Sequence, residues 1–365
     1  MFPDLGYYPW YSSLHKNQCQ GDNYDDIYPL LGLKLVIHIE QEQHQTMRSG
    51  PSKSVLVIGI AGGILAVSTA SIFIRFAQEY TTSIVIAAMR LTFASLILAP
   101  IALSRHMTEI KSVKNKDLLL GIASGIFLAL HFATWISSLE YTSVASSVVL
   151  VTTTPLWVAL LSPLLLKEPV TRPVIIGMVL ALLGGMLIGL ADACTWQNGI
   201  YCPSMGDYFK GQAFWGNFLA LMGAWMAAGY LIIGRRLRAK LSLIPYIFIV
   251  YSISAVILLV LMFFTGQSPF NLPPVAYVWM LLLAVIPQLL GHSTFNWALK
   301  YLPASMVAIT LLGEPIGSTI LAFIILNEVP SITELAGAAM ILIGIYLASI
   351  TEPRKEVEEA IVANE

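Results

Sequence analysis

Charged residues are scarce in this chain of 365 residues, of which only 11% are Asp, Glu, Lys or Arg. Soluble domains carry roughly 25% charged residues, and the 57% of hydrophobic residues here exceed what a water-soluble core could bury. The composition therefore excludes a soluble globular protein and indicates an integral membrane protein, with the lipid bilayer as its surroundings. The net charge of -1 says nothing about partners, and we expect no nucleic acid among them.

Alternating polar and apolar residues, the pattern of membrane-spanning strands, are also absent, so the apolar segments are interpreted as helices. Ten segments are long enough, at about 20 residues each, to cross a hydrocarbon core of roughly 30 Å. They cover residues 55–76, 82–103, 117–139, 143–166, 173–190, 212–234, 243–264, 275–299, 304–326 and 332–350. The sequence therefore predicts an all-α polytopic membrane protein with ten transmembrane helices.

Lys and Arg are nearly absent from every second connection between these segments. Seventeen of the twenty lie in the flanks and connections of one side, whereas the other side holds only Lys210; the remaining two, Arg75 and Arg90, lie within helices. Because positive residues are retained on the cytoplasmic side, the asymmetry predicts that both termini are cytoplasmic. We expect a multi-pass protein of the cell (plasma) membrane.

Cysteine is sparse, and the first 54 residues lack the regions of a cleavable signal peptide. Cys194 and Cys202 share the long external loop, where an oxidising compartment would permit a disulfide; the pair is either bridged or two free thiols. Residues 1–54 form a polar cytoplasmic flank, and Met47 begins a short basic lead-in typical of a membrane protein's start. The region before Met47 is either dispensable, a misassigned start, or a small cytosolic appendage.

An internal repeat is present, because the second half of the chain matches the first at an offset of 160 residues. The matches need no gap and pair Thr134 with Thr294, Tyr141 with Tyr301, Pro155 with Pro315, Leu166 with Leu326, Glu168 with Glu328, Gly177 with Gly337, and Gly184 with Gly344. Each half carries five segments. Because five is odd, the second half enters the membrane from the opposite side to the first, which predicts that the two copies have opposite orientations. We expect repeats at 55–190 and 211–350, an external loop at 191–210 and a cytoplasmic tail at 351–365.

Two prolines beside polar side chains occupy corresponding places in the predicted fourth and ninth helices. Glu314 lies about ten residues from either end of its segment, where a carboxylate costs roughly 2.5–3.5 kcal/mol, and Pro315 follows it. Thr154 and Pro155 form the matching pair. Such helix breaks indicate a central binding site; the alternative is that both prolines kink their helices for packing and that Glu314 holds a structural hydrogen bond.

Arg90 is the other charge deep within a segment, in the second helix. It could pair with Glu314, bind a substrate carboxylate, snorkel toward an interface, or bond to helix carbonyls as a structural residue. On the eighth segment Gln288, His292 and Asn296 recur at intervals of four residues, which places three polar groups on one face. We expect that face to point inward.

His131 and Trp135 lie one turn apart on the third segment and give an aromatic face with one titratable group. A histidine there either packs as a satisfied interior residue or carries protons. An intramembrane enzyme would need a nucleophile or metal-ligand cluster; His131 and His292 lie on separate helices without that spacing, so we expect no enzyme, no metal and no cofactor.

The order of proline, a Leu-x-Glu ending and a glycine-spaced next helix resembles the EamA domain of the drug/metabolite transporter superfamily. It occurs twice, as Pro155, Leu166, Lys167, Glu168, Gly177 and Gly184, and as Glu314, Pro315, Leu326, Asn327, Glu328, Gly337 and Gly344. The resemblance implies a bundle of ten helices with a central cavity. Proteins of this kind move small organic solutes such as amino acids across the membrane, often outward. By the same analogy, the cavity candidates are Trp135, Thr154, Asn296 and Glu314.

The sequence thus predicts a secondary transporter, an exporter of small organic metabolites such as amino acids, that works by alternating access around a central cavity. Protons are a candidate coupling ion, and a homo-oligomer is compatible with the sequence. A solute-sensing receptor or scaffold without flux is the alternative, with an intramembrane enzyme as the third reading.

Overall fold

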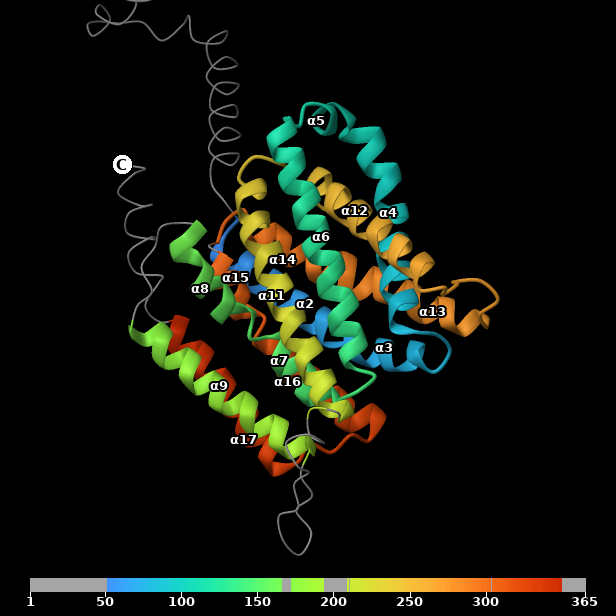
Figure 1. The fold of residues 1–365 in the computed structure, drawn as a ribbon. Coiled ribbons are helices and arrows are strands. Elements are labelled where there is room, and N and C mark those ends of the chain that lie inside the picture. The colour runs from blue at the N-terminus through green and yellow to red at the C-terminus, as the bar shows by residue number, and fades with distance from the viewer. Residues whose placement is uncertain (1–50, 166–171, 194–208, 210, 303, 350–365) are drawn as a thin grey trace, which may run out of the picture. The chain divides into compact units, whose positions relative to one another are not determined.

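The computed structural model describes residues 51–165, 172–193, 209, 211–302 and 304–349. Every regular element within these ranges is a helix, as the composition predicts (Figure 1). Cys194, Cys202, the flank before residue 51 and the tail after residue 349 lie outside the described residues, so the expectations placed on them stay predictions.

Helices from the two halves of the sequence follow the predicted segments closely. The first half comprises α2 (Lys53–Ser68), α3 (Ala70–Gln78), α4 (Ser83–Arg105), α5 (Met107–Lys111), α6 (Asn115–Ser138), α7 (Val144–Val151), α8 (Thr154–Leu165) and α9 (Arg172–Ala193). The second half comprises α11 (Gln212–Arg238), α12 (Leu243–Phe264), α13 (Pro274–Leu283), the π-helix η1 (Ala284–His292), α14 (Ser293–Ala298), α15 (Ala304–Thr310), α16 (Gly313–Leu321), the π-helix η2 (Ala322–Leu326) and α17 (Ile332–Ser349).

Eight helical stretches within the described residues are long and apolar enough to cross a membrane. Two shorter apolar stretches, Ile175–Ile188 of α9 and Ile332–Leu347 of α17, occupy the fifth and tenth predicted places. Large apolar side chains are exposed on these helices, including Ile58 (72%), Leu65 (70%) and Phe263 (78%). Because no water-soluble protein could expose so many, these surfaces are suited to contact with lipid, and the protein is an integral multi-pass membrane protein.

The predicted fourth helix is interrupted between α7 and α8, at Thr152 and Thr153. Pro155 has no N–H to continue the ladder, so carbonyl groups in the preceding turn lose their partners. The hydroxyl of Thr154 donates at 2.9 Å to the carbonyl oxygen of Val151, four residues before Pro155, and Thr152 Oγ1 lies 2.9 Å from the carbonyl oxygen of Val149. The break is therefore stabilised locally by side-chain bonds to the backbone.

The predicted ninth helix is interrupted at the matching place, between α15 and α16. The chain leaves the helical path at Leu311 and Leu312, and α16 starts again at Gly313. The N–H of Glu314 donates to the carbonyl of Leu311 at 2.9 Å, a three-residue turn that tightens the junction. Glu314 therefore lies in the first turn of a new helix rather than in the middle of a continuous one.

Helices α9 and α17 lie side by side and run antiparallel (Figure 1). A Cβ atom added at Gly184 would lie 2.6 Å from the carbonyl oxygen of Gly337, and one added at Gly344 would lie 2.6 Å from that of Gly177. Because these four residues are two pairs at the 160-residue offset, each helix presents to its partner the same glycines that its partner presents to it. Close backbone contact of this kind requires small residues.

Other contacts repeat with the two halves exchanged. Gly63 of α2 faces Thr294 of α14, with a constructed Cβ 3.1 Å from Thr294 Cγ2, and Gly223 of α11 faces Thr134 of α6, with a constructed Cβ 3.4 Å from Thr134 Oγ1. The offset of 160 residues maps Gly63 of the first contact onto Gly223 of the second, and Thr134 of the second onto Thr294 of the first. This reciprocity is what a two-fold relation between the halves requires, and it places α2 against η1 and α14, and α11 against α6.

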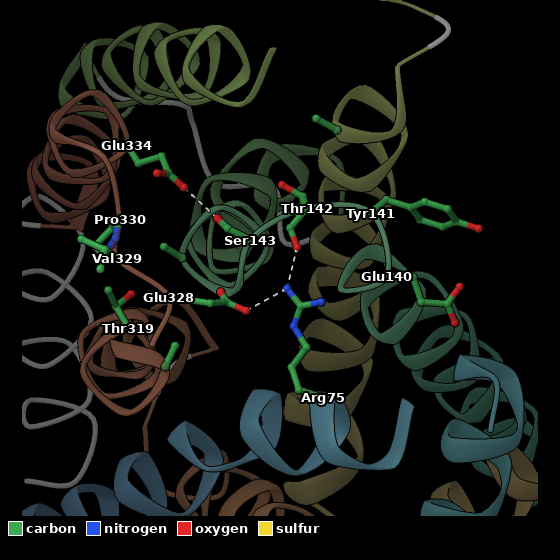
Figure 2. Close-up of a pocket in the computed structure, with 13 residues that line it drawn as sticks. Arg75, Glu140, Tyr141, Thr142, Ser143, Thr319, Glu328, Val329, Pro330 and Glu334 are labelled. Atoms are coloured by element: carbon green, nitrogen blue, oxygen red, sulfur yellow. Dashed lines mark hydrogen bonds and ion pairs between the residues drawn. The ribbon is translucent and has the colours of Figure 1, made fainter. Parts of the chain in front are cut away.

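Two arginines occupy equivalent positions near the ends of α3 and α11. Arg75 donates to the carbonyl oxygens of Leu139 and Thr142, the latter at 3.0 Å (Figure 2). Its counterpart Arg235 donates to the carbonyl of Leu299 at 2.6 Å. Leu139 and Leu299 end equivalent helices, so in each half an arginine binds carbonyls left free at a helix C-terminus.

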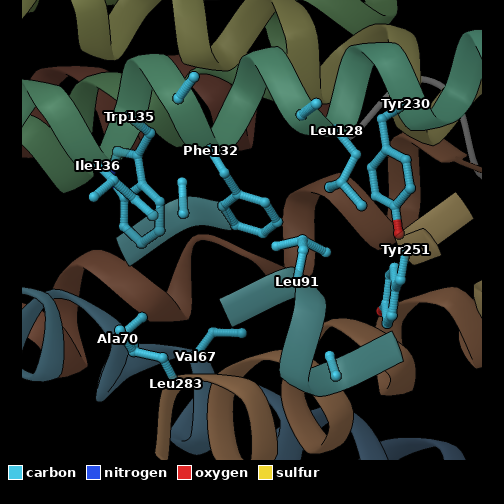
Figure 3. Packing of buried hydrophobic residues seen from close by; sticks show 14 of the residues in the cluster. Val67, Ala70, Leu91, Leu128, Phe132, Trp135, Ile136, Tyr230, Tyr251 and Leu283 are labelled. Atoms are coloured by element: carbon cyan, nitrogen blue, oxygen red, sulfur yellow. The ribbon is translucent and has the colours of Figure 1, made fainter. Parts of the chain in front are cut away.

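The interior between the halves is packed with aliphatic and aromatic side chains. Leu91 of α4 lies between Phe132 and Leu128 of α6 on one side and Tyr251 of α12 on the other, and all four side chains are fully buried (Figure 3). This cluster fixes the mutual position of α4, α6 and α12. Buried hydroxyls add polar contacts between α6 and α12: Ser254 Oγ donates to the carbonyl oxygen of Gly125 at 2.7 Å.

Candidate functional site

A small central cavity lies between the two interrupted helices and the faces of α6, α11, η1 and α14. Its volume is about 40 Å³, room for a few water molecules. It is lined by His131, Trp135, Val151, Thr152, Thr154, Ala227, Tyr230, Leu231, His292, Phe295, Leu311 and Glu314. The structure thus brings five of the sequence-predicted site residues to one cavity: His131, Trp135, Thr154, His292 and Glu314.

Aromatic rings form one wall of the central cavity. His131 stacks on Trp135 with ring centroids 5.9 Å apart and an angle of 13° between the planes, and its ring meets that of His292 at 6.3 Å. Nδ1 of His131 lies 2.9 Å from the carbonyl oxygen of Gly223. Because a carbonyl can only accept, Nδ1 carries the proton, and the neutral ring leaves Nε2 as an acceptor.

Glu314 supplies the carboxylate of the cavity. It is half-buried in the first turn of α16, where the unpaired N–H groups of a helix start favour a negative charge. Among the described residues no cationic group lies within 4 Å of its carboxylate. The carboxylate is therefore placed to contact a cationic group or a proton that enters the cavity.

Three predicted site residues do not line the cavity but lie behind its wall. Arg90 and Gln288 are fully buried and bonded to each other, Arg90 Nε donating to Gln288 Oε1 at 2.9 Å. Asn296 accepts from the hydroxyl of Tyr230 at 2.6 Å and donates to that of Tyr251 at 3.2 Å. These hydrogen bonds direct the three side chains into the helix contacts rather than into the space.

The three polar residues of the eighth helix point into the protein: Gln288 and Asn296 are fully buried and His292 lines the cavity, but the three do not share one surface. Residues 284–292 form a π-helix around Pro287, whose missing N–H disturbs the ordinary ladder. A wider helical turn no longer superimposes side chains four residues apart. His292 consequently lines the cavity, whereas Gln288 turns to α4 and Asn296 to α11 and α12.

A larger polar cleft, here named the Arg75 cleft, opens where the α6–α7 turn of the first half meets α16, η2 and the start of α17. Its volume is about 490 Å³, and it is lined by Arg75, Glu140, Tyr141, Thr142, Ser143, Ala145, Ala213, Thr319, Ala322, Glu328, Val329, Pro330 and Glu334. Figure 2 shows Arg75 reaching between Glu328 and the backbone at Thr142.

Contacts in the Arg75 cleft join the two halves of the chain. Arg75 Nη2 lies 3.1 Å from Glu328 Oε1, and the other oxygen of Glu328 accepts from the N–H of Val144 at 2.9 Å. The hydroxyl of Ser143 donates to Glu334 Oε1 at 2.7 Å. The sequence does not predict this site, because it places Arg75 only within a helix and Glu328 only in the Leu-x-Glu ending of the repeat. The offset that maps Arg75 onto Arg235 is the signal that could have found it.

Within the described residues, no three His, Cys, Asp or Glu side chains come together as a metal site would need. The chemistry of the central cavity is that of recognition: one carboxylate, aromatic rings, hydroxyls and a histidine acceptor around a small space. Such convergent polar groups in an otherwise apolar pocket are typical of a small-molecule site.

The chain belongs to the EamA-like transporter family, whose model matches residues 54–190 and again residues 214–350. Each match covers one half, so the repeat found in the sequence consists of two EamA repeats. Their boundaries agree with the α2-to-α9 and α11-to-α17 sets of helices.

Two known proteins that are named transporters are similar to this chain. An uncharacterized transporter of Archaeoglobus fulgidus is 25% identical over 306 residues, covering 83% of this chain and 97% of its own. The uncharacterized transporter YyaM of Bacillus subtilis is 26% identical over 247 residues, covering 66% and 75%. One solved crystal structure shares the fold with a TM-score of 0.58 at 17% identity, covering 84% of this chain and all of its own. The family and the names of these relatives point to a transporter.

Proposed function

We propose that this protein is a secondary transporter that exports small organic metabolites, amino acids among them, by alternating access around the central cavity. The observation that carries the proposal is the position of that cavity, which lies between the interrupted helix of the first half and the interrupted helix of the second half. Discontinuous helices at corresponding repeat positions place free backbone groups and polar side chains at the substrate site of many transporters.

The proposed mechanism is a rocking of one five-helix repeat against the other. The repeats extend over residues 55–190 and 211–350, with both termini in the cytoplasm and residues 191–210 outside. In this orientation the Arg75 cleft lies at the external end of the cavity. Its contacts between halves, Arg75 with Glu328 and Ser143 with Glu334, would hold that end closed in the described conformation.

Glu314 is assigned the role of contacting the cationic group of the solute or of taking up a proton. Its place in the first turn of α16, beside a break, lets it follow the movement of that short helix. A proton on Glu314 or a cationic solute at Glu314 would satisfy the same carboxylate, so the two would compete. Competition of this kind couples solute flux to a proton gradient.

The test is flux of labelled amino acids and related metabolites into proteoliposomes with an imposed pH gradient. We expect wild-type protein to transport some solutes of the panel. Glu314→Gln should lower that flux at least about tenfold, which corresponds to a rise of about 1.4 kcal/mol in the barrier to transport. Glu79→Gln, which removes an exposed carboxylate at the end of α3, is the matched control and should keep wild-type flux.

If wild-type protein shows neither gradient-driven nor exchange flux for any solute of the panel, the transport function is refuted and solute sensing is favoured. If wild-type flux is present but Glu314→Gln keeps both its rate and its pH dependence, the transporter stands and the role of Glu314 is overturned.

A further inference from the structure

Arg90 has more hydrogen-bond donors than its surroundings satisfy. Its side chain is fully buried, and its Nε donates to Gln288 Oε1 at 2.9 Å. Its Nη1 and Nη2 atoms are buried without a hydrogen-bond partner among the described residues. A guanidinium carries five N–H groups, so four of the five lack an acceptor here. Buried donors of this kind require an explanation, since nearly all others in proteins are paired.

The charge of Arg90 is also poorly compensated. The guanidinium lies over the ring of Phe132, 4.1 Å from its centroid, a contact worth about 2 kcal/mol when desolvated. Burial of an ion costs several kcal/mol. No ion pair within 4 Å joins Arg90 to Glu314 or to another carboxylate of the described residues. The site therefore has a cation whose Nη1 and Nη2 donors lack an acceptor among these residues.

The free edge of Arg90 has the shape that binds a carboxylate. Gln288 binds Nε of Arg90, so the edge of the guanidinium formed by Nη1 and Nη2 is left without a partner among the described residues. Two N–H groups of a guanidinium match the two oxygens of a carboxylate in geometry. Trp135 Nε1 is another buried donor without a partner among the described residues, and it lines the central cavity. Unpaired donors without acceptors thus occur both at Arg90 and on the cavity wall.

Only a layer of rings separates Arg90 from the cavity. The guanidinium stacks on Phe132, and Phe132 meets His292 edge to face with centroids 5.2 Å apart. His292 itself lines the central cavity. A turn of these two rings would join the Nη edge of Arg90 to the space that Glu314 faces.

We propose that Arg90 and Gln288 form a binding site for a carboxylate-like anionic group, reached from the central cavity past Phe132 and His292. The inference rests on the proposed transport function for one of its two sources, a solute that bears a carboxylate; the other source is a free small anion from solution. A solute with both charges would place its carboxylate at Arg90 and its cationic group at Glu314.

The first arm of the test measures thermal unfolding of the full-length protein in detergent, with sodium formate compared with sodium chloride at equal ionic strength. Formate is expected to raise the wild-type Tm by at least about 2 °C, through binding to the folded state alone. Arg90→Gln should abolish the shift, while Arg105→Gln, an exposed arginine on the same helix, should keep it.

If Arg90→Gln does not fold, Arg90→Lys replaces it. Lysine keeps the cation but lacks the planar fork, so the Tm in formate should fall to the Tm in chloride. The absence of any anion shift in wild-type protein, or an equal shift in the Arg90 variants, would overturn the proposal.

The second arm identifies the source of the anionic group. Flux of L-phenylalanine and other amino acids is compared with flux of the amines that lack the carboxylate, such as phenethylamine. Loss of amino-acid flux in Arg90→Lys with amine flux retained assigns the site to the solute. An anion shift that needs Arg90, together with flux that does not, assigns it to a free anion. Wild-type protein without any flux would refute the transport function, and the first arm would still decide the anion site.

Discussion

Glu314 and Arg90 are intramembrane charges accommodated in different ways. Glu314 is half-buried at a helix start and faces the central cavity, so its carboxylate can interact with water, a proton or a ligand. Arg90 is sealed within the core with one bonded nitrogen. Removing the first charge should therefore affect transport with little effect on folding, whereas removing the second acts on a binding site beneath the cavity wall.

Glu109 illustrates a carboxylate outside the membrane-spanning helices, in α5. Burial opposes its ionisation, but the hydroxyl and the N–H of Ser242 both donate to the carboxylate and hold its pKa below the usual range. A carboxylate with a depressed pKa in the folded state stabilises it above the unfolded pKa and loses that effect as pH falls. The contact ties α5 of the first half to the N-terminus of α12 in the second.

We predict that Glu109→Gln lowers the Tm at pH about 7 and that the deficit relative to wild type narrows between pH about 5 and pH about 3, as the wild-type carboxyl protonates. Thermal unfolding of both proteins across this range is the measurement, with Glu79→Gln as an exposed control. A deficit that stays constant with pH would show that the contact does not depend on charge.

At the scale of elements, the two interrupted helices depend on residues that satisfy the backbone locally. Thr152, Thr153 and Thr154 each donate to a carbonyl three or four residues earlier, and Thr154 also lies 3.4 Å from the carbonyl of Ala224 in α11. In hydrocarbon, an unpaired carbonyl is costly. The breaks are therefore tolerated where they face a cavity and a neighbouring helix, away from lipid.

The antiparallel pair of α9 and α17 gives the prediction at this scale. Gly337→Val would place a Cβ 2.7 Å from the carbonyl oxygen of Gly184, which neither backbone can avoid without shifting. We expect a loss of about 1–3 kcal/mol, the cost of overpacking a tight contact. The measurement is the thermal unfolding midpoint in detergent.

Gly62→Val is the matched control, since a Cβ at Gly62 meets nothing within 4 Å. It should change the midpoint by much less than Gly337→Val. Equal midpoints for the two variants would mean that α9 and α17 do not meet through their glycines.

At the scale of the whole molecule, the contacts of the Arg75 cleft are predicted to bias the protein toward a conformation closed at its external end. Arg75→Gln removes the ion pair to Glu328; the side chains of Arg75 and Glu328 are 26% and 30% exposed. We expect the free-energy difference between the two conformations to change by about 1 kcal/mol, which is roughly a five-fold change in their population ratio.

The measurement is the rate at which an impermeant thiol reagent, added from outside, modifies Thr154→Cys in a background without native cysteines. Arg75→Gln should raise this rate about five-fold, by the same population change. Arg235→Gln, the equivalent substitution at the opposite end of the molecule, should not raise it. Faster external labelling in Arg235→Gln than in Arg75→Gln would reverse the proposed orientation.

Much of the fold could be predicted from periodicity and the repeat, because helix length and glycine spacing are local properties of the chain. The matches of Gly177 with Gly337 and Gly184 with Gly344 predicted equivalent helices, and the structure places those glycines against one another. The site was predicted less completely. Gln288 and Asn296 are polar residues of the kind that line cavities, but Gln288 of the π-helix bonds to Arg90 of α4, and Asn296 of α14 bonds to Tyr230 of α11.

The sequence alone determined that the chain is a helical membrane protein of two EamA repeats, because hydrophobicity, segment length and a constant offset are properties of residue order and need no knowledge of positions in space. Only the tertiary structure decided which polar groups meet: Arg75 with Glu328 across the halves, and Arg90 beside Gln288 with its remaining donors unpaired. The reason is physical. Hydrogen bonds and ion pairs form within about 3 Å, and such distances between residues up to 250 positions apart are fixed by how helices pack.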